Sequence, residues 1–151
     1  MKFIQLTSSD ILIFRELIQL YCDVFEDKKT YDNTNVSDEY LRHFLANESH
    51  VVVVALSENN TVIGGLVAYQ LDKFGKESKE LYIYDLAVLE SQQRQGIGTN
   101  LINEVVKIAK QRNASVVFVQ ADAEDIHAVS FYRKIFTNEL IAHQFELEVK
   151  L

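Results

Sequence analysis

A turn between a predicted strand and a predicted helix carries the residues best suited to bind an anion. Residues 86–99 read Leu-Ala-Val-Leu-Glu-Ser-Gln-Gln-Arg-Gln-Gly-Ile-Gly-Thr. The glycines Gly96 and Gly98 let backbone N–H groups approach a ligand without interference from a Cβ atom. The N-terminus of the following helix adds a partial positive charge that suits a phosphate, and Arg94 could form an ion pair with it.

Carboxylates form a second set of residues with chemical potential. Asp85 lies in a predicted strand between Tyr84 and Leu86, where a charge costs free energy unless it is paired or functional. We expect other carboxylates near the C-terminal ends of strands or in the loops beyond them, namely Glu80, Asp122, Glu124 and Asp125. Five more are expected in the loop and second helix that would form the opposite wall of a substrate pocket, namely Glu26, Asp27, Asp32, Asp38 and Glu39. Partly desolvated carboxylates would attract a polycation, whereas most loop carboxylates are simply solvated.

The elements that must position these residues follow the order β-α-α-β-β-β-α-β-α-β, which predicts one mixed α/β domain over residues 1–151. Hydrophobic spacing predicts helices over 10–25, 37–47, 98–112 and 125–136. Strands are predicted over 3–6, 50–56, 61–71, 80–88, 115–120 and 139–149, the last as one strand or a pair. The short apolar run 115–120 suggests a buried position in the sheet.

Composition excludes several classes of function. The chain has 151 residues and a net charge of −7, which argues against a nucleic-acid partner. No apolar run approaches the length of a membrane span, and there is no signal-peptide pattern. The single cysteine, Cys22, fits a helix core and a reducing cytoplasm. The four histidines have no metal-ligand spacing, so we predict no metal.

The turn resembles the signature of the GNAT N-acetyltransferase superfamily. Gln93 to Gly98 matches its Gln/Arg-x-x-Gly-x-Gly/Ala motif after a strand ending in Leu-Ala-Val, and Phe131-Tyr132-Arg133-Lys134 matches its Tyr-x-Lys segment. The resemblance implies an α/β fold with a central mixed sheet of six to seven strands and about four helices. It also implies acetyl-CoA as cosubstrate, and Tyr132 as the proton donor to the departing thiolate. Residues implied to bind the coenzyme are Leu86, Ala87, Val88, Gln93, Arg94, Gln95, Gly96, Ile97, Gly98, Thr99 and Asp125.

Three further segments resemble type I aminoglycoside 3-N-acetyltransferases. They are residues 81–88, residues 118–129 and the pair 25–31 and 37–41. The resemblance implies acetylation of an aminoglycoside, at its 3-amino group. Such a substrate carries several ammonium groups, so its pocket needs carboxylates, and we expect Glu80, Asp122 and Glu124 in the substrate site. The chain departs from these families at two places. His127 stands where the aminoglycoside acetyltransferases are expected to have proline, and residues 135–138 stand where the superfamily usually has Gly-Phe. The second departure suggests a left-handed Asn138, and His127 could assist coenzyme binding or be an ordinary surface histidine.

The attacking amine must lose a proton, so a carboxylate or a relayed water must accept it. Asp85 is our first choice of base, with Asp122 or Glu80 as alternatives. Other polyamines, small amines or protein amines are alternative substrates, and a non-catalytic acyl-CoA sensor is an alternative function. The expected location is the cytoplasm. The superfamily resemblance also allows a homodimer joined through C-terminal strands.

Overall fold

A computed structural model describes residues 1–151 as two compact units, 1–120 and 121–151. The first unit contains a five-stranded sheet and three α-helices, and the second contains one α-helix. The elements are β1 (Lys2–Gln5), α1 (Ile11–Phe25), α2 (Asp38–Ala46), β2 (His50–Leu56), β3 (Val62–Asp72), β4 (Lys79–Val88), the 3₁₀ turn η1 (Glu90–Gln92), α3 (Ile97–Gln111), β5 (Ala114–Val119) and α4 (Ile126–Arg133). The mixed α/β class is therefore confirmed.

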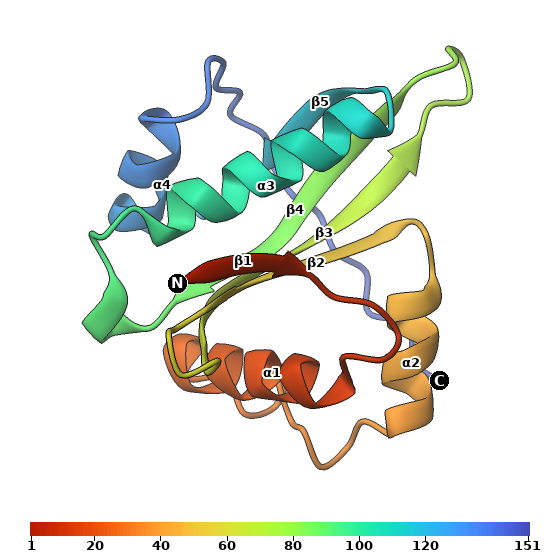
Figure 1. The fold of residues 1–151 in the computed structure, drawn as a ribbon. Helices are drawn as coiled ribbons and strands as arrows, with labels where there is room; N and C mark the ends of the chain where they lie inside the picture. Colours follow the sequence, from red (N-terminus) through yellow and green to blue (C-terminus); the bar gives the residue numbers. More distant parts are fainter. The chain divides into compact units, whose positions relative to one another are not determined.

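Helices cover both faces of the sheet in the first unit. Helices α1 and α2 lie on one face and α3 on the other (Figure 1). Two adjacent glycines of β3 mark how closely the helices approach. A Cβ atom at Gly65 would come within 2.3 Å of the Leu17 side chain of α1, and one at Gly64 within 3.3 Å of Ile97 of α3. The core between α1, α2 and the sheet contains buried Leu17, Leu41 and Val54.

The helix boundaries follow from capping residues that the sequence contains. The Ser37 hydroxyl accepts a hydrogen bond from the Tyr40 N–H at 3.1 Å and caps α2, while Asp38 and Glu39 occupy its positive first turn. Asn113 takes a left-handed conformation (φ 57°) directly after α3. These boundaries confirm the predicted helices 37–47 and 98–112 to within a residue or two.

The sheet is mixed, as predicted. Strands β1 to β4 pair antiparallel in chain order, and β5 pairs parallel to β4. The prediction that 115–120 is a buried strand is wrong, because β5 pairs only with β4 at the edge of the sheet. Its Ser115 is exposed and Val116 is 43% exposed. An apolar run fits a buried strand and a half-buried edge equally well, so sequence alone does not separate them.

The predicted strand over 139–149 is also wrong, which leaves five strands instead of six or seven. Leu140, Phe145 and Leu147 are each more than nine-tenths exposed. Alternating residues give a segment the tendency to be extended, but a strand also needs a partner edge for its backbone hydrogen bonds. Helix α4 is shorter than predicted, and Asn138 is not left-handed.

Two smaller observations complete the fold. Cys22 is buried and carries a free thiol, as the helix pattern predicts. None of the helices has both the length and the apolar character that crossing a membrane requires.

Candidate functional site

The turn before α3 has the backbone geometry of an anion-binding loop. Arg94 (φ 60°) and Gly96 (φ 80°) both adopt left-handed conformations, and residues 93–96 are exposed. The first helical hydrogen bond runs from the Asn100 N–H to the Gly96 carbonyl at 2.9 Å. The N–H groups of residues 97–99 therefore have no partner within the helix. They carry the positive end of the helix dipole at an exposed turn.

Gln93, one of the residues predicted to bind the coenzyme, attaches the turn to the end of β4. The Gln93 backbone N–H donates to the Glu90 carbonyl at 3.2 Å, and its side-chain Nε2 donates to the Val88 carbonyl at 3.2 Å. Buried Ile97 anchors the other end of the turn in the core. Gln93 thus acts here as a structural brace that fixes the turn relative to β4.

The second half of β4 has a free edge beside this turn. The pairing of β4 with β5 ends at Ile83 and Val119, while the pairing with β3 continues to Val88. Residues 84–88 therefore have no strand on the β5 side. The backbone groups on that side can receive an extended ligand that carries amides, because such a ligand can bond there as an added strand would.

A β-bulge decides the direction of the Asp85 side chain. Val67 pairs with Asp85 but Ala68 pairs with Ile83, so Tyr84 is the extra residue of the bulge. Without the bulge, Asp85 would lie on the same face as buried Ile83. With it, Asp85 shares the face of Tyr82, which is the face that α1 and α2 cover in part.

Asp85 is half-buried and partnered by tyrosines. Burial raises the pKa of the Asp85 carboxyl above its ordinary value, and a hydrogen bond from the Tyr31 hydroxyl opposes that rise. The Tyr21 hydroxyl also reaches the Asp85 backbone carbonyl, at 3.4 Å. A carboxylate with a raised pKa in a partly desolvated position is the kind of group that accepts protons in active sites.

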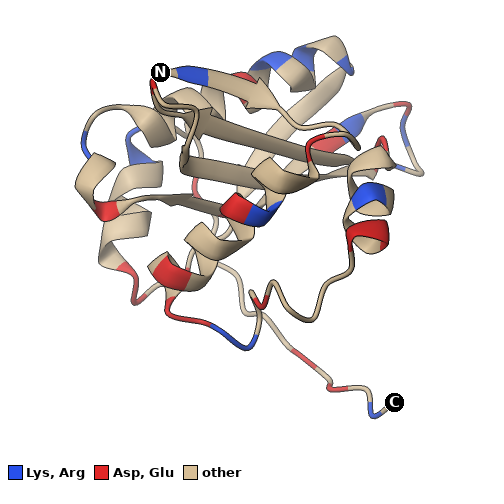
Figure 2. Ribbon diagram, turned by 60° about the horizontal axis from the view of Figure 1, so that its bottom comes forward, with Lys and Arg blue, Asp and Glu red and all other residues tan.

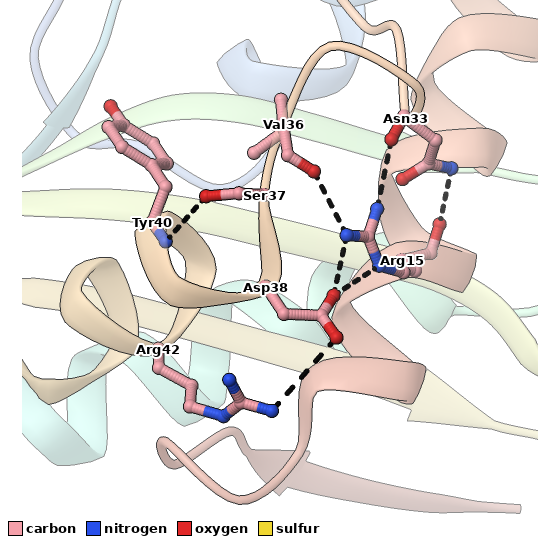
Figure 3. Close-up of polar contacts among 7 residues, drawn as sticks. All are labelled: Arg15, Asn33, Val36, Ser37, Asp38, Tyr40 and Arg42. Atoms are coloured by element: carbon pink, nitrogen blue, oxygen red, sulfur yellow. Dashed lines mark hydrogen bonds and ion pairs between the residues drawn. The ribbon is translucent and has the colours of Figure 1, made fainter.

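Tyr31 is held in place through the loop between α1 and α2. Arg15 of α1 donates to the carbonyls of Asn33 and Val36, both at 2.9 Å, and forms an ion pair with Asp38 at 2.6 Å (Figure 3). Asn33 returns a hydrogen bond to the Arg15 carbonyl at 3.0 Å. This clamp fixes the loop after Tyr31, and the Tyr31 ring packs against Tyr21 at 5.5 Å.

Glu80 lies apart from Asp85. It stands at the beginning of β4, not near a C-terminal strand end as expected, and the five residue steps along the strand separate the two by about 16 Å. Its carboxylate forms an ion pair with Lys73 at 2.7 Å. The structure therefore does not bring Glu80 and Asp85 together.

The carboxylates expected on the opposite wall serve largely to shape the loop. Asp27 accepts from the Thr30 N–H at 3.0 Å, Asp32 accepts from the Thr34 N–H at 2.8 Å, and Asp38 pairs with Arg15. Glu26 caps the end of α1 in a left-handed conformation, and Glu39 is exposed. Acidic residues are spread along the ribbon over helices, loops and the C-terminal segment (Figure 2).

The remaining predicted residues lie in the second unit. Asp125 caps α4 by accepting the Ala128 N–H at 2.9 Å, while Asp122 and Glu124 are exposed in the turn before it. Tyr132 is half-buried, with its ring 5.2 Å from Phe131 and 5.8 Å from Phe136. His127 is exposed in α4. The functional roles of these residues stay predictions.

The sequence alone does not reveal the tyrosines that surround Asp85. In the sequence, Tyr31 lies at the end of a segment that resembles the aminoglycoside acetyltransferases, and Tyr21 lies within the predicted helix 10–25. The Tyr-Ile-Tyr-Asp run of residues 82–85 was the one available signal, because it places two aromatic rings next to a carboxylate in a strand. The bulge that orients these side chains has no sequence marker here, since it contains no glycine.

Comparison with known proteins identifies the family to which the chain belongs. The model of the acetyltransferase (GNAT) family matches residues 14–136. The chain belongs to this acetyltransferase family. The match includes the exposed turn, the free edge of β4 and Asp85. It confirms the resemblance that Gln93 to Gly98 suggested.

Solved structures with similar chains include two aminoglycoside acetyltransferases from an uncultured soil metagenomic sample. One is 34% identical, with a TM-score of 0.92, and the match covers 99% of this chain and 98% of that one. The other, solved in complex with sisomicin, is 37% identical with the same TM-score and covers 99% and 96%. A ribosomal-protein-alanine N-acetyltransferase from Brucella melitensis biovar Abortus 2308 shares the fold at 15% identity and a TM-score of 0.72, covering 97% and 100%.

Proposed function

We propose that this acetyltransferase moves an acetyl group from acetyl-CoA to a primary amine of an aminoglycoside. Two aminoglycoside acetyltransferases resemble the chain over nearly its whole length, and one of them is in complex with sisomicin. The observation that carries the proposal is the half-buried Asp85 carboxylate, which lies on the strand whose free edge leads to the exposed turn. A site for a cationic amine thus adjoins a site for an extended anionic ligand.

Acetyl-CoA suits the backbone groups of the first unit. Its pyrophosphate would bind the N–H groups at residues 94–99, which the left-handed Arg94 and Gly96 expose. Its pantetheine amides would pair with Leu86, Ala87 and Val88 along the free edge of β4. When bound, it supplies the acetyl group as a thioester. Backbone N–H groups of residues 86–88 would stabilise the negative charge on the carbonyl oxygen during attack.

Asp85 would remove the proton from the substrate ammonium. An ammonium must become a neutral amine before it can attack, and a carboxylate whose pKa is raised toward neutrality is a better proton acceptor than an ordinary one. Burial of Asp85 supplies that rise. Tyr132 would donate a proton from its hydroxyl to the leaving sulfur, a role that rests on its match to the Tyr-x-Lys segment.

A thiol-release assay tests the proposal. Purified chain with acetyl-CoA would be offered kanamycin, gentamicin, spermidine and a lysine peptide at equal concentrations. We expect the highest kcat/KM with an aminoglycoside, and NMR of the product to place the acetyl group on the 3-amino nitrogen. Preference for spermidine or the peptide would instead identify a polyamine or protein acetyltransferase. Absence of turnover with all four, despite tight acetyl-CoA binding, would favour a non-catalytic sensor.

The carboxylates outside the Asp85 site give a second test of the same substrate class. Asp122 and Glu124 are exposed and would attract a polycation through charges that salt screens over about 10 Å at 0.1 M. We therefore expect the KM for kanamycin to rise with salt concentration. The Asp122→Asn variant should raise that KM more than the KM for a monoamine. A KM that is independent of salt would contradict a polycationic substrate.

A further inference from the structure

We propose that a row of aromatic side chains beside Asp85 is a subsite that stacks against an ammonium-bearing sugar ring of the substrate. The aromatic row consists of Tyr69 of β3, Tyr82 and Tyr84 of β4 and Phe118 of β5. The inference rests on the proposed function, because it takes the aminoglycoside as the ligand. It assigns to these four residues a role in binding the substrate, in addition to the role of the carboxylates.

The rings of the row contact one another across three strands. Tyr69 meets Tyr84 edge to face at 5.5 Å, Tyr84 meets Tyr82 at 5.8 Å, and Tyr82 stacks on Phe118 at 4.8 Å with the planes 8° apart. The pairings of Tyr69 with Tyr82 and of Tyr82 with Phe118 place these three rings on one face of the sheet. This is the face toward which the bulge directs Asp85.

The row is open where a substrate would need it. Tyr84 is 58% exposed, and Tyr69, Tyr82 and Phe118 are partly exposed. Large aromatic side chains on a sheet face are usually covered by a helix, but α1 contacts mainly β3 and β4, and α2 contacts mainly β2. At the far end, the Tyr82 hydroxyl donates to the Gln120 side chain at 3.0 Å, which fixes the orientation of that ring.

The electrostatic character of the row matches an amino sugar. The face of an aromatic ring carries negative charge density and attracts cations that lie within about 6 Å of the ring centre. Burial raises the pKa values of the Tyr69 and Tyr82 phenols, and the nearby Asp85 carboxylate raises them further. The phenols therefore remain neutral, and their ring faces together with Asp85 form a negative surface. An amino sugar offers both an ammonium group and a flat apolar C–H face to such a surface.

The test removes one exposed ring and keeps its neighbours. Tyr84→Leu retains apolar bulk but loses the ring face, whereas Tyr84→Phe retains the face and loses only the hydroxyl. Isothermal calorimetry with kanamycin should give a dissociation constant about tenfold weaker for Tyr84→Leu and nearly unchanged for Tyr84→Phe. Phe74→Leu is the matched control, because Phe74 is fully exposed in the loop between β3 and β4. It should bind kanamycin as the wild type does.

The outcomes separate the subsite from the proposed function. Wild-type protein that acetylates kanamycin, with Tyr84→Leu binding equally tightly, would overturn the aromatic subsite and leave the function standing. Equal losses in Tyr84→Leu and Phe74→Leu would also overturn it, because the effect would then not depend on the row. Wild-type protein that neither binds nor acetylates an aminoglycoside would overturn the function, and the subsite with it. Unchanged acetyl-CoA affinity and a normal melting temperature establish that Tyr84→Leu is folded.

Discussion

Asp85 lies in strand β4, and the exposed turn follows the end of that strand. The two sites are nevertheless built in different ways. The turn over residues 93–99 uses backbone N–H groups, and its geometry depends on local conformations such as the left-handed Gly96. The Asp85 site uses side chains from separate segments, with Tyr21 from α1, Tyr31 from the following loop and, through its electrostatic interaction with Asp85, Tyr69 from β3. One is a local structure and the other a tertiary assembly.

This difference predicts different sensitivities to substitution. Backbone N–H groups remain when most side chains of the turn change, so the turn should fail only where a backbone conformation is lost. The Asp85 site should respond to substitutions at several positions far apart in the chain. Some of these, such as Tyr31, would alter the chemistry of Asp85 without touching the coenzyme.

Replacing Asp85 with asparagine should give the largest loss. The variant keeps the size of the side chain but cannot accept a proton, so kcat should fall by about 100-fold or more, as for loss of a general base. Acetyl-CoA affinity should not change. Steady-state kinetics and calorimetry measure the two effects. A Glu80→Gln variant with the greater loss of kcat would instead identify Glu80 as the base.

The stability of the Asp85→Asn variant provides its folding control. Because burial raises the pKa of Asp85 above 3.8, the ionised form destabilises the folded chain, and this cost grows as pH rises above that value. Asparagine removes the cost. The variant should therefore melt at or above the wild-type temperature at pH 7. A clearly lower melting temperature would mean that lost packing accounts for lost turnover.

Replacing Tyr132 with phenylalanine tests a residue that belongs neither to the turn nor to the Asp85 site. The ring and its contacts with Phe131 and Phe136 are retained, and only the hydroxyl is lost. If the hydroxyl protonates the leaving sulfur, kcat should fall by about 100-fold with little change in acetyl-CoA affinity. Single-turnover kinetics would locate the loss in the chemical step. Turnover close to wild type would assign Tyr132 to packing.

Replacing Gly96 with valine should damage the turn alone. A β-branched residue strains a backbone at φ 80°, so the N–H groups at residues 97–99 would shift from their positions. Acetyl-CoA should bind about tenfold more weakly or worse, a change of about 1.4 kcal/mol. Gly75→Val is the matched control, because a Cβ atom there meets nothing within 4 Å and the residue has no positive φ. Equal affinities in both variants would argue against the turn as the coenzyme site.

Replacing Tyr31 with phenylalanine should produce the smallest and most specific effect. The Tyr31 hydroxyl lowers the pKa of Asp85, so its loss should raise that pKa further. Asp85 would then stay protonated to a higher pH, and the acidic limb of the kcat profile should move to higher pH. Carboxyl-carbon NMR of Asp85 would measure the same shift without any assay of activity. Tyr40→Phe, on α2, should leave both measurements unchanged.

Local patterns in the sequence are sufficient to predict the elements that depend on local chemistry. Helix α2 begins at Ser37 because its hydroxyl can cap the helix, and α3 ends where Asn113 can adopt a left-handed conformation. The order of the elements up to α4 and the position of the turn also follow from patterns within a few residues. The family motif at Gln93 to Gly98 could be recognised for the same reason. It is contiguous, and it depends on backbone geometry that glycine permits.

The environment of Asp85, in contrast, depends on contacts between distant parts of the chain. The bulge at Tyr84 arises from the register between β3 and β4, and it places Asp85 opposite Val67 instead of on the face of Ile83. Arg15 holds the loop that carries Tyr31, through partners 18 to 23 residues away in the chain. The edge position of β5 and the absence of a strand over 139–149 likewise depend on which strand edges pair with one another. Strand pairing joins distant residues, and a local pattern contains no information about its register.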